Sequence, residues 1–215
     1  VPQRATAADV DGGFFAIAGT TASGNGVFYA GVGALSSTGA TFDFGSTHGV
    51  TGLGSDICIA GDQLFVSAAS HADGHVYVYE FNPGIPEWIF QHELSLPPWS
   101  AQTDGISPSF GFSIDCDGTT LMVGAPGVDD SGAEDRGAVY MYKRDPVTGE
   151  WVLFDDFLGG DCQAGQQFGY DVAISGAAAI GGAPFADDGA EVDVGLVQRL
   201  WFNSATGIWN GAGLA

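Results

Sequence analysis

The residues whose types and spacing could support chemistry are mostly carboxylates, gathered in two short groups. Each group has four acidic residues within seven positions of the chain. A calcium ion takes its oxygen ligands from a short flexible loop, so such groups could bind calcium. Without a cation, like charges at this spacing need plentiful water around them, and a solvated acidic face is the favoured interpretation. The residues are Asp129, Asp130, Glu134 and Asp135 in the first group, and Asp187, Asp188, Glu191 and Asp193 in the second.

Two further carboxylate pairs stand in the pattern Asp-x-Asp-Gly. They are Asp9 with Asp11, and Asp115 with Asp117. Two carboxylates in a tight turn are too few for a complete calcium site. Aspartate in a turn commonly accepts a hydrogen bond from its own backbone. We therefore expect these pairs to cap turns, with calcium binding as the weaker alternative.

Other side chains offer less chemistry. The histidine cluster of His71 and His75, with Asp73 between them, lacks a third metal ligand or a general base on regular structure. The sequence contains no G-x-S-x-G, P-loop or H-E-x-x-H motif. Trp99 lies in the proline-rich segment LPPWS, outside the pattern of the other tryptophans. It is the best single candidate for contact with a ligand.

The cysteines are Cys58, Cys116 and Cys162, an odd number with no C-x-x-C pair, so they predict no zinc site. The favoured interpretation is that they are buried or half-buried thiols, because cysteine behaves as a small hydrophobic residue. An intermolecular disulfide through Cys162, which lies in the polar loop 159–167, is the alternative.

The elements that must position these residues repeat along the chain. Glycines fall in register at positions 12, 61, 118 and 176, at intervals of 49, 57 and 58 residues. A period of this length indicates a repeat architecture. Two more columns follow in the same order: the segments GVFYAGVG, GHVYVYEF, GAVYMYKR and GLVQRLWF, and then the aromatic residues Phe42, Trp88, Trp151 and Trp209.

Each repeat unit predicts four short strands and no helix. The runs are short, rich in β-branched, aromatic and small residues, and bounded by Gly, Asp and Pro. Segments 145–149 and 203–207 have the composition of hairpin turns. We therefore predict an all-β fold, a β-propeller built of four-stranded antiparallel blades. The recurring tryptophans are expected to pack between blades, and the small residues of the second strands are expected to fit the crowded propeller axis.

The segments FGFSI from residue 110 with VGAP from residue 123, and FGYDV from residue 168 with GAP from residue 182, resemble the FG-GAP repeat. This repeat is the blade of integrin alpha-subunit propellers and of many bacterial and algal surface proteins. The Asp-rich loop 127–137 matches the bacterial type. The first two units are degenerate, with Leu53-Gly54 and Arg4-Ala5 in place of Phe-Gly. The resemblance implies four FG-GAP-like blades, at residues 4–52, 53–109, 110–167 and 168–215, within one propeller-type domain over 1–215.

The resemblance also implies calcium, which the family binds in an Asp-rich loop between the first two strands. Family propellers usually have seven blades, whereas this chain supplies four. Three arrangements stay open: four blades that close alone, part of a longer chain, or closure by association with copies of itself.

Composition limits the classes of function. The 215 residues carry 26 acidic and five basic side chains, a net charge of −21, so the chain repels phosphate and is expected to bind no nucleic acid. No apolar run is long enough for direct membrane insertion. The hydrophobic fraction of 45% is sufficient for a core. Near-absence of lysine fits a saline, extracellular or cell-surface setting.

Together these features favour a non-catalytic extracellular module for adhesion, recognition or the building of a surface appendage or filament. Its partners would be a protein or glycan ligand, copies of itself or other surface proteins. Two alternatives stay open: a propeller hydrolase that acts on polysaccharide or phosphoester through a metal site in the acidic loops, and a carbohydrate-binding lectin.

Overall fold

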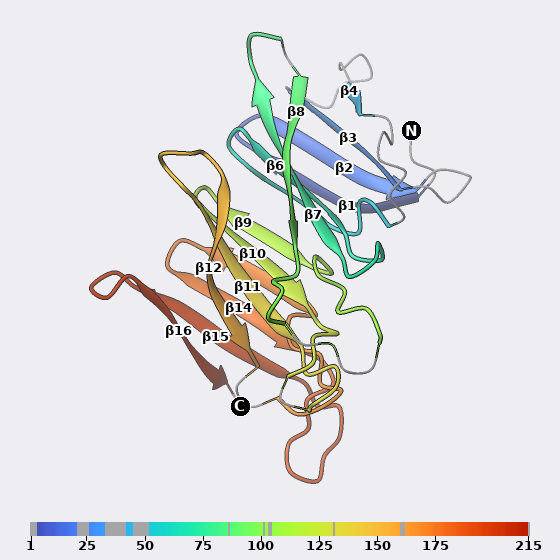
Figure 1. The fold of residues 1–215 in the computed structure, drawn as a ribbon, viewed down its shortest axis with the longest axis vertical. Helices are drawn as coiled ribbons and strands as arrows, with labels where there is room; N and C mark the ends of the chain where they lie inside the picture. Colours follow the sequence, from blue (N-terminus) through green and yellow to red (C-terminus); the bar gives the residue numbers. More distant parts are fainter. Residues whose placement is uncertain are drawn as a thin grey trace. The chain divides into compact units, whose positions relative to one another are not determined.

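The computed structural model describes residues 4–20, 26–32, 42–44, 52–85, 87–100, 102, 105–130, 132–159 and 162–214. These residues form an all-β fold of four antiparallel sheets, each with four strands (Figure 1). The chain divides into two compact units, residues 1–95 and 96–215, and each unit holds two of the sheets. In the described ranges there is no helix that could cross a membrane.

The first unit contains blade 1 and blade 2. The strands of blade 1 are β1 (Arg4–Asp11), β2 (Phe14–Thr20), β3 (Gly26–Val32) and β4 (Phe42–Phe44), and those of blade 2 are β5 (Ile57–Ala60), β6 (Gln63–Ala68), β7 (His75–Asn82) and β8 (Glu87–Ser95).

The second unit contains blade 3 and blade 4. The strands of blade 3 are β9 (Ile114–Asp117), β10 (Thr120–Ala125), β11 (Ala138–Arg144) and β12 (Trp151–Leu158), and those of blade 4 are β13 (Asp171–Ser175), β14 (Ala178–Ala183), β15 (Leu196–Asn203) and β16 (Ile208–Leu214).

Every blade is a meander in which each strand pairs with the next strand along the chain. The predicted four-stranded blades are therefore confirmed, and each predicted blade span contains one sheet. The turns are those that glycine permits: Gly118 and Gly176, between the first two strands of blades 3 and 4, have φ of +52° and +58°. Gly149 closes the turn after β11, where its N–H donates to the carbonyl of Asp145 at 2.9 Å.

Inside each unit, one face of the first blade covers one face of the second. We call these the forward face and the rear face. In the second unit, Met122 and Met141 on the forward face of blade 3 share a core cluster with Val172, Ile174 and Leu200 on the rear face of blade 4. In the first unit, the corresponding cluster joins Ala16, Ala18 and Phe28 of blade 1 to Ile57, Ile59 and Leu64 of blade 2. The repeat unit buries its apolar face only by stacking on its neighbour.

The recurring tryptophans are buried. Trp88, Trp151 and Trp209 are 2%, 4% and 4% exposed. Trp88 and Trp209 belong to the core clusters of the first and second unit. The prediction that these tryptophans pack in the interior is confirmed.

The Phe-Gly turns hold each blade's second strand by a repeated backbone contact. The N–H of Gly111 donates to the carbonyl of Gly124 at 3.0 Å, and the N–H of Gly169 donates to that of Gly182 at 3.0 Å. In the degenerate blade 2, the N–H of Gly54 makes the same bond to Ser67 at 2.7 Å. Leu53-Gly54 is therefore a working replacement for Phe-Gly.

The small residues of the second strand of blade 3 are required by contact with the next blade. A Cβ atom on Gly124 would lie 2.0 Å from the carbonyl oxygen of Gly169, and one on Gly137 would lie 2.1 Å from that of Phe168. The first unit repeats this contact, since a Cβ on Gly26 would lie 2.1 Å from the carbonyl oxygen of Leu53. The sequence therefore uses glycine where the Phe-Gly or Leu-Gly turn of the following blade touches the preceding one.

Candidate functional site at the loop end of blades 3 and 4

The acidic groups after the GAP motifs form two similar hairpins. In blade 3, Asp130 and Ala133 exchange two backbone hydrogen bonds, at 3.1 and 2.8 Å. In blade 4, Asp188 and Glu191 do the same, at 3.0 Å each. Both hairpins follow the second strand and precede the third, so antiparallel pairing places them at the same end of their blades as the Phe-Gly turns. We call this end the loop end.

The first carboxylate of each hairpin closes it. Asp129 accepts a hydrogen bond at Oδ1 from the backbone N–H of Asp135 at 2.9 Å, and Asp187 accepts one from that of Asp193 at 3.0 Å. Asp135 and Asp193 have φ of +49° and +55°, in the left-handed region that aspartate tolerates better than most residues. Of the eight carboxylates predicted as possible calcium ligands, two therefore close the hairpins. Two others, Asp135 and Asp193, occupy strained backbone positions in the same hairpins.

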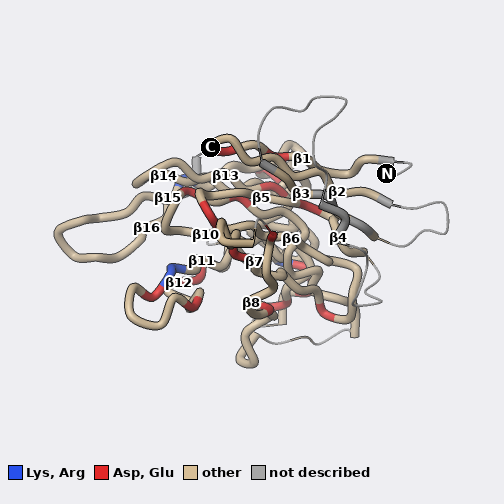
Figure 2. The backbone as a smooth tube through the Cα atoms, turned by 90° about the horizontal axis from the view of Figure 1, so that it is seen from above, with Lys and Arg blue, Asp and Glu red and all other residues tan. Residues whose placement is uncertain are grey.

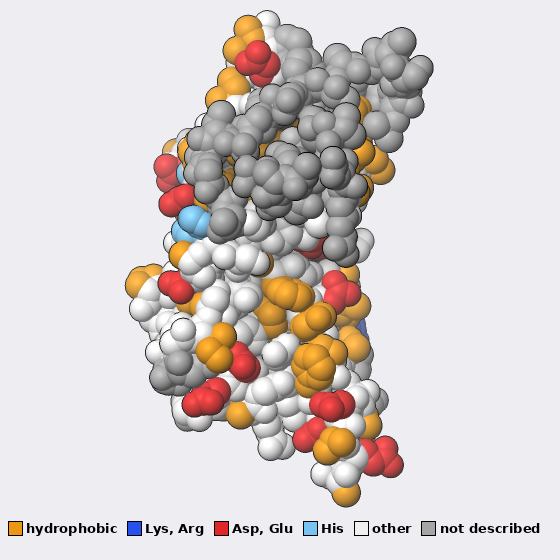
Figure 3. All heavy atoms as spheres, turned by 90° about the vertical axis from the view of Figure 1, so that its right-hand side faces the viewer, with side chains coloured by type: hydrophobic (Ala, Val, Ile, Leu, Met, Phe, Trp, Pro, Cys, Tyr) orange, Lys and Arg blue, Asp and Glu red, His pale blue; other side chains and the backbone are white. Residues whose placement is uncertain are grey.

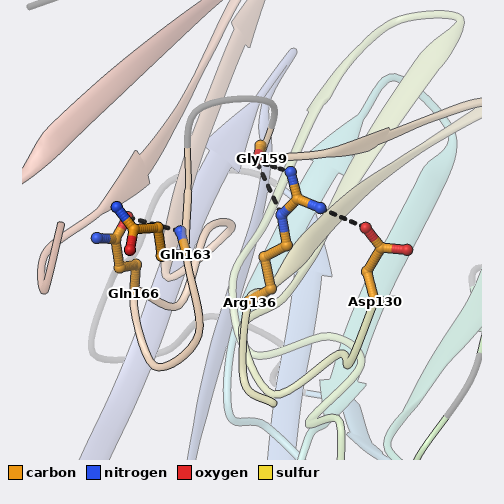
Figure 4. Close-up of polar contacts among 5 residues, drawn as sticks. All are labelled: Asp130, Arg136, Gly159, Gln163 and Gln166. Carbon is orange, nitrogen blue, oxygen red and sulfur yellow. Dashed lines mark hydrogen bonds and ion pairs between the residues drawn. The ribbon is translucent and has the colours of Figure 1, made fainter. Parts of the chain in front are cut away.

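The blade 3 hairpin also carries an ion pair (Figure 4). The guanidinium of Arg136 donates from Nη1 to Asp130 and, from Nε and Nη2, to the carbonyl oxygen of Gly159 at 3.1 and 2.9 Å. One cation thus joins the hairpin to the segment that follows β12. In the same region, the backbone N–H of Gln163 donates to Oε1 of the buried Gln166 at 2.9 Å.

The Asp-x-Asp-Gly pairs of the second unit bind the backbone of the next blade. Asp115 accepts at Oδ2 from the N–H of Ile174 at 2.6 Å, and Asp117 accepts from the N–H of Gly176. Oδ1 of Asp115 also accepts from the N–H of Cys116 at 2.9 Å. The prediction of a turn-capping role was incomplete, because the carboxylates cap the following strand as well as their own.

The first unit has the same arrangement. Asp9 accepts at Oδ2 from the N–H of Ile59 at 2.7 Å, and Asp11 accepts from that of Gly61 at 2.7 Å. Oδ1 of Asp9 accepts from the N–H of Val10 at 2.8 Å. We call the two sets, Asp9 with Asp11 and Asp115 with Asp117, the interblade clamps.

These contacts bear on the calcium that the resemblance implies. Calcium needs oxygen atoms that point at a common centre. Both oxygens of Asp9 and of Asp115 instead point at N–H donors, so the clamps do not fit a calcium site. Among the described residues, no three His, Cys, Asp or Glu side chains are grouped so that they could hold a metal. Calcium in the two hairpins stays a prediction.

The structure reveals an exposed aromatic row that the sequence analysis missed. The rings of Phe112 and Tyr170 lie 4.7 Å apart, and those of Tyr170 and Phe185 lie 6.0 Å apart in an edge-to-face arrangement. Each of the three side chains is about two fifths exposed. Figure 3 shows hydrophobic side chains gathered on one face of the second unit with acidic side chains around them. The signal in the sequence was a second aromatic residue directly after both Phe-Gly motifs.

A pocket of about 540 Å³ adjoins this row on blade 4. Its wall includes the aromatic side chain of Tyr170, the carboxylate of Asp171 and the apolar side chain of Val197. Gly182 and Gly195 form part of its wall as well, so the backbone is accessible there. The pocket has the mixed apolar and polar lining of a recognition surface.

Trp99, the predicted ligand contact, is 65% exposed. It lies in a turn that the N–H of Ser100 closes on the carbonyl of Pro97 at 3.0 Å. The hydroxyl of Ser100 is 2.7 Å from that of Tyr140, and burial raises the pKa of Tyr140 to about 12. Trp99 thus stands on an anchored turn, and its role in binding stays a prediction.

Cys162 and the histidine cluster are placed without a clear chemical use. The prediction of buried thiols is correct for Cys162 and wrong for Cys58 and Cys116, which are disulfide-bonded. Cys162 is buried in the core cluster of the second unit, so an intermolecular disulfide would require its loop to open. That bridge stays a prediction. The rings of His71 and His75 lie 5.3 Å apart, and no third ligand is grouped with them in the described ranges.

Acidic residues are far more frequent than basic residues along the described chain (Figure 2). Two of them have shifted pKa values. Hydrogen bonds from the N–H groups of Val147 and Thr148 lower the pKa of Asp145, which caps the turn after β11. Burial, with repulsion from Asp155, raises the pKa of Asp156. Asp145 lies at the end of blade 3 opposite the loop end, and Asp156 lies within β12.

Four consecutive four-stranded meanders, stacked face on face within each unit, define a repeat protein built of β-propeller blades. The family model of the FG-GAP repeat matches residues 107–142, the first part of blade 3. Residues 107–142 are therefore similar to the FG-GAP repeat, and the other three sheets share the four-stranded meander topology of the matched blade. No curated protein matches the sequence significantly.

Proposed function

We propose that this chain is a non-catalytic extracellular propeller module that recognises a ligand through the loop end of blades 3 and 4. The observation that carries the proposal is the exposed row of Phe112, Tyr170 and Phe185 beside the acidic hairpins. Exposed aromatic side chains in mutual contact offer a large apolar surface at low entropic cost. Loops that vary on a rigid blade scaffold are the usual place for such sites.

A glycan is the ligand class that this surface suits best. The flat faces of the aromatic rings can stack on the apolar face of a sugar ring. The exposed carboxylates of Asp188 and Glu191 supply hydrogen-bond acceptors for hydroxyl groups. An anionic polysaccharide is disfavoured, because the net charge of the chain is −21. Adhesion to neutral surface glycans would follow from this chemistry.

The arrangement of the carboxylates supports a role without catalysis. A hydrolase that used the hairpins as a metal site would need the oxygens of Asp129 and Asp130 to face a common centre. In the structure they accept from the backbone N–H of Asp135 and from Arg136. A screen for hydrolysis of polysaccharides and phosphoesters, with Asp129→Asn and Asp187→Asn as controls, tests this part. Activity that both substitutions abolish would establish the hydrolase alternative.

Binding to a printed array of neutral and charged glycans tests the recognition role. The double variant Phe112→Ala and Tyr170→Ala removes the row, while Phe154→Ala removes an aromatic side chain of similar exposure on β12. We expect the wild type and the Phe154→Ala variant to bind a shared set of neutral glycans and the double variant to lose them. Equal binding by all three proteins would show that the row is not the site, and no binding by the wild type would exclude glycan recognition.

A further inference from the structure

Lys143, the only lysine of the chain, lies over two aromatic rings. Its Nζ atom is 3.7 Å from the centre of the Phe154 ring and 4.2 Å from the centre of the Phe202 ring. Although the chain has 26 acidic side chains, this ammonium makes no hydrogen bond or ion pair with any residue that the structure describes. Burial lowers the pKa of Lys143, and the charge of Asp155 opposes that shift. The N–H donors of Lys143 are therefore available to an acceptor from outside the chain.

Lys143 forms part of the wall of a pocket of about 250 Å³ in the second unit. The pocket lies beside the turns that join the first two strands of blades 3 and 4, at the end of the blades opposite the loop end. We call it the turn-end pocket. It is smaller than the roughly 300–1,000 Å³ of pockets that hold drug-sized ligands, so it suits a small molecule. Its wall includes Asp117, Thr120 and Lys143 of blade 3, and Phe202 and Trp209 of blade 4.

Three polar side chains of this wall stand side by side on one face of blade 3. Thr120 pairs directly with Asp117 on β9 and with Lys143 on β11, and residues paired across antiparallel strands point to the same face. Thr120 is only 6% exposed, and its hydroxyl makes no hydrogen bond within the described chain. Asp117 accepts at Oδ2 from the N–H of Gly176, and its other oxygen has no partner among the described residues. Buried polar groups are normally paired, so these three side chains point to a polar ligand.

The charges of the turn-end pocket decide which polar ligand fits. A simple anion is disfavoured, because Asp117 and the net charge of −21 repel it, and a simple cation is repelled by Lys143. A zwitterion satisfies both charges at once, since its carboxylate can accept from Lys143 while its ammonium donates to Asp117. In the described chain no ion pair joins Lys143 to Asp117, and Thr120 separates them in the row. A ligand with both charges can bridge that gap.

We propose that the turn-end pocket binds a free α-amino acid, with the carboxylate of the ligand on Lys143 and Thr120 and its ammonium on Asp117. The rings of Phe202 and Trp209 supply an apolar wall for the side chain of the ligand. Because both blades of the second unit contribute to the wall, the bound ligand stabilises their packing by mass action. The pocket lies at the opposite end of the blades from the aromatic row, so binding here goes beyond glycan recognition and succeeds or fails independently of it.

Isothermal titration calorimetry of the full chain with L-alanine, L-serine and L-phenylalanine tests this assignment. Propionate lacks the ammonium, ethylamine lacks the carboxylate, and D-glucose has neither charge. We expect at least one of the amino acids to bind, and to bind at least about tenfold more tightly than each comparison compound, because each charge contributes a charge-assisted hydrogen bond. The indole N–H resonance of Trp209, assigned with Trp209→Phe, should shift when the amino acid is added, which locates binding at the pocket.

Two variants and a matched control test the named residues. Lys143→Met keeps an apolar stem over the two rings without the charge, and Thr120→Val removes the hydroxyl. Arg199→Met is the control, because Arg199 carries the same charge over the ring of Trp201, at 5.7 Å from its centre, and is not part of the pocket wall. Lys143→Met should weaken binding at least about tenfold and Thr120→Val about two- to tenfold, while Arg199→Met should bind as the wild type does.

Wild-type protein that binds none of the three amino acids would overturn the proposal. Propionate, ethylamine or glucose that binds as tightly as the best amino acid would overturn the ligand class, and a Lys143→Met variant that binds like the wild type would overturn the site. The comparison of ligands needs no variant, so the test stands even where a substitution impairs folding, which thermal unfolding detects. The double variant Phe112→Ala and Tyr170→Ala should leave amino-acid binding unchanged, which separates this pocket from the glycan surface.

Discussion

Removal of one carboxylate from an interblade clamp is expected to lower the stability of a single unit by a predictable amount. Asp115→Ala deletes a carboxylate that accepts from Ile174 N–H at 2.6 Å and from Cys116 N–H at 2.9 Å. Hydrogen bonds to a charged group contribute about 1.5–3 kcal/mol each, and a buried donor left without a partner costs about as much. Ile174 is only 8% exposed, so its N–H is poorly reached by water. Cys116 N–H lies in the same turn as the carboxylate and is more easily rehydrated.

The free energy of unfolding of the second unit should therefore fall by about 2 kcal/mol in Asp115→Ala, mainly from the bond to Ile174. For a chain of this size such a loss lowers Tm by roughly 4–8 °C. Asp115→Asn keeps an acceptor but loses the charge, and about half of the effect is expected. Asp73→Ala, which removes an exposed carboxylate of the first unit, is the control and should leave Tm within about 1 °C.

Urea denaturation measures the loss, and amide hydrogen exchange locates it. The amide of Ile174 should exchange faster by about 30-fold, the equivalent of about 2 kcal/mol, while that of Ile59 in the first unit stays protected. The reasoning is refuted if Asp115→Ala is as stable as Asp73→Ala. It is refuted as well if the loss appears only when calcium is present, because the carboxylate would then act as a metal ligand and not as a hydrogen-bond acceptor.

Three further outcomes follow from the described contacts. Gly124→Ala should destabilise the second unit by about 3 kcal/mol or more in chemical denaturation, because its Cβ would lie 2.0 Å from the backbone oxygen of Gly169. Gly182→Ala should be nearly neutral, because its Cβ would meet nothing closer than 3.7 Å. Equal losses in the two variants would contradict the close contact between Gly124 and the Phe168-Gly169 turn. Asp156→Asn should raise the free energy of unfolding at pH 7 by less than about 1 kcal/mol, and Tm with it. The reason is that the raised pKa of Asp156 makes the folded state lose stability as the pH rises through that pKa. The gain should vanish at a pH well below 3.8, where aspartate is as neutral as asparagine, and a gain that persists there would point to another cause. Any rise in Tm that millimolar calcium causes should be the same in Asp115→Ala as in the wild type, since the clamp oxygens face N–H donors. A rise that Asp187→Asn abolishes would place calcium in the blade 4 hairpin, and one that Asp115→Ala abolishes would contradict the assignment of the clamps.

The sequence shows where much of the candidate site lies, but it does not show what the individual side chains of the site contact. The acidic groups after GAP were recognised as loops, yet spacing alone could not show that Asp129 and Asp187 close hairpins, because their donors lie six residues along the chain. The aromatic row was missed because Phe112 and Tyr170 stand in different repeats, 58 positions apart. They meet only when blade 4 stacks on blade 3.

The sequence by itself determined the architecture of the blades, because strand length, turn glycines and the apolar period are local properties that repeat four times. The glycines and tryptophans at equivalent positions of successive repeats can be aligned without any structure. The tertiary structure decided what the carboxylates do. The partners of Asp9 and Asp115 lie 50 and 59 residues away in the next blade, and a bond over that separation exists only after one repeat has packed on the next.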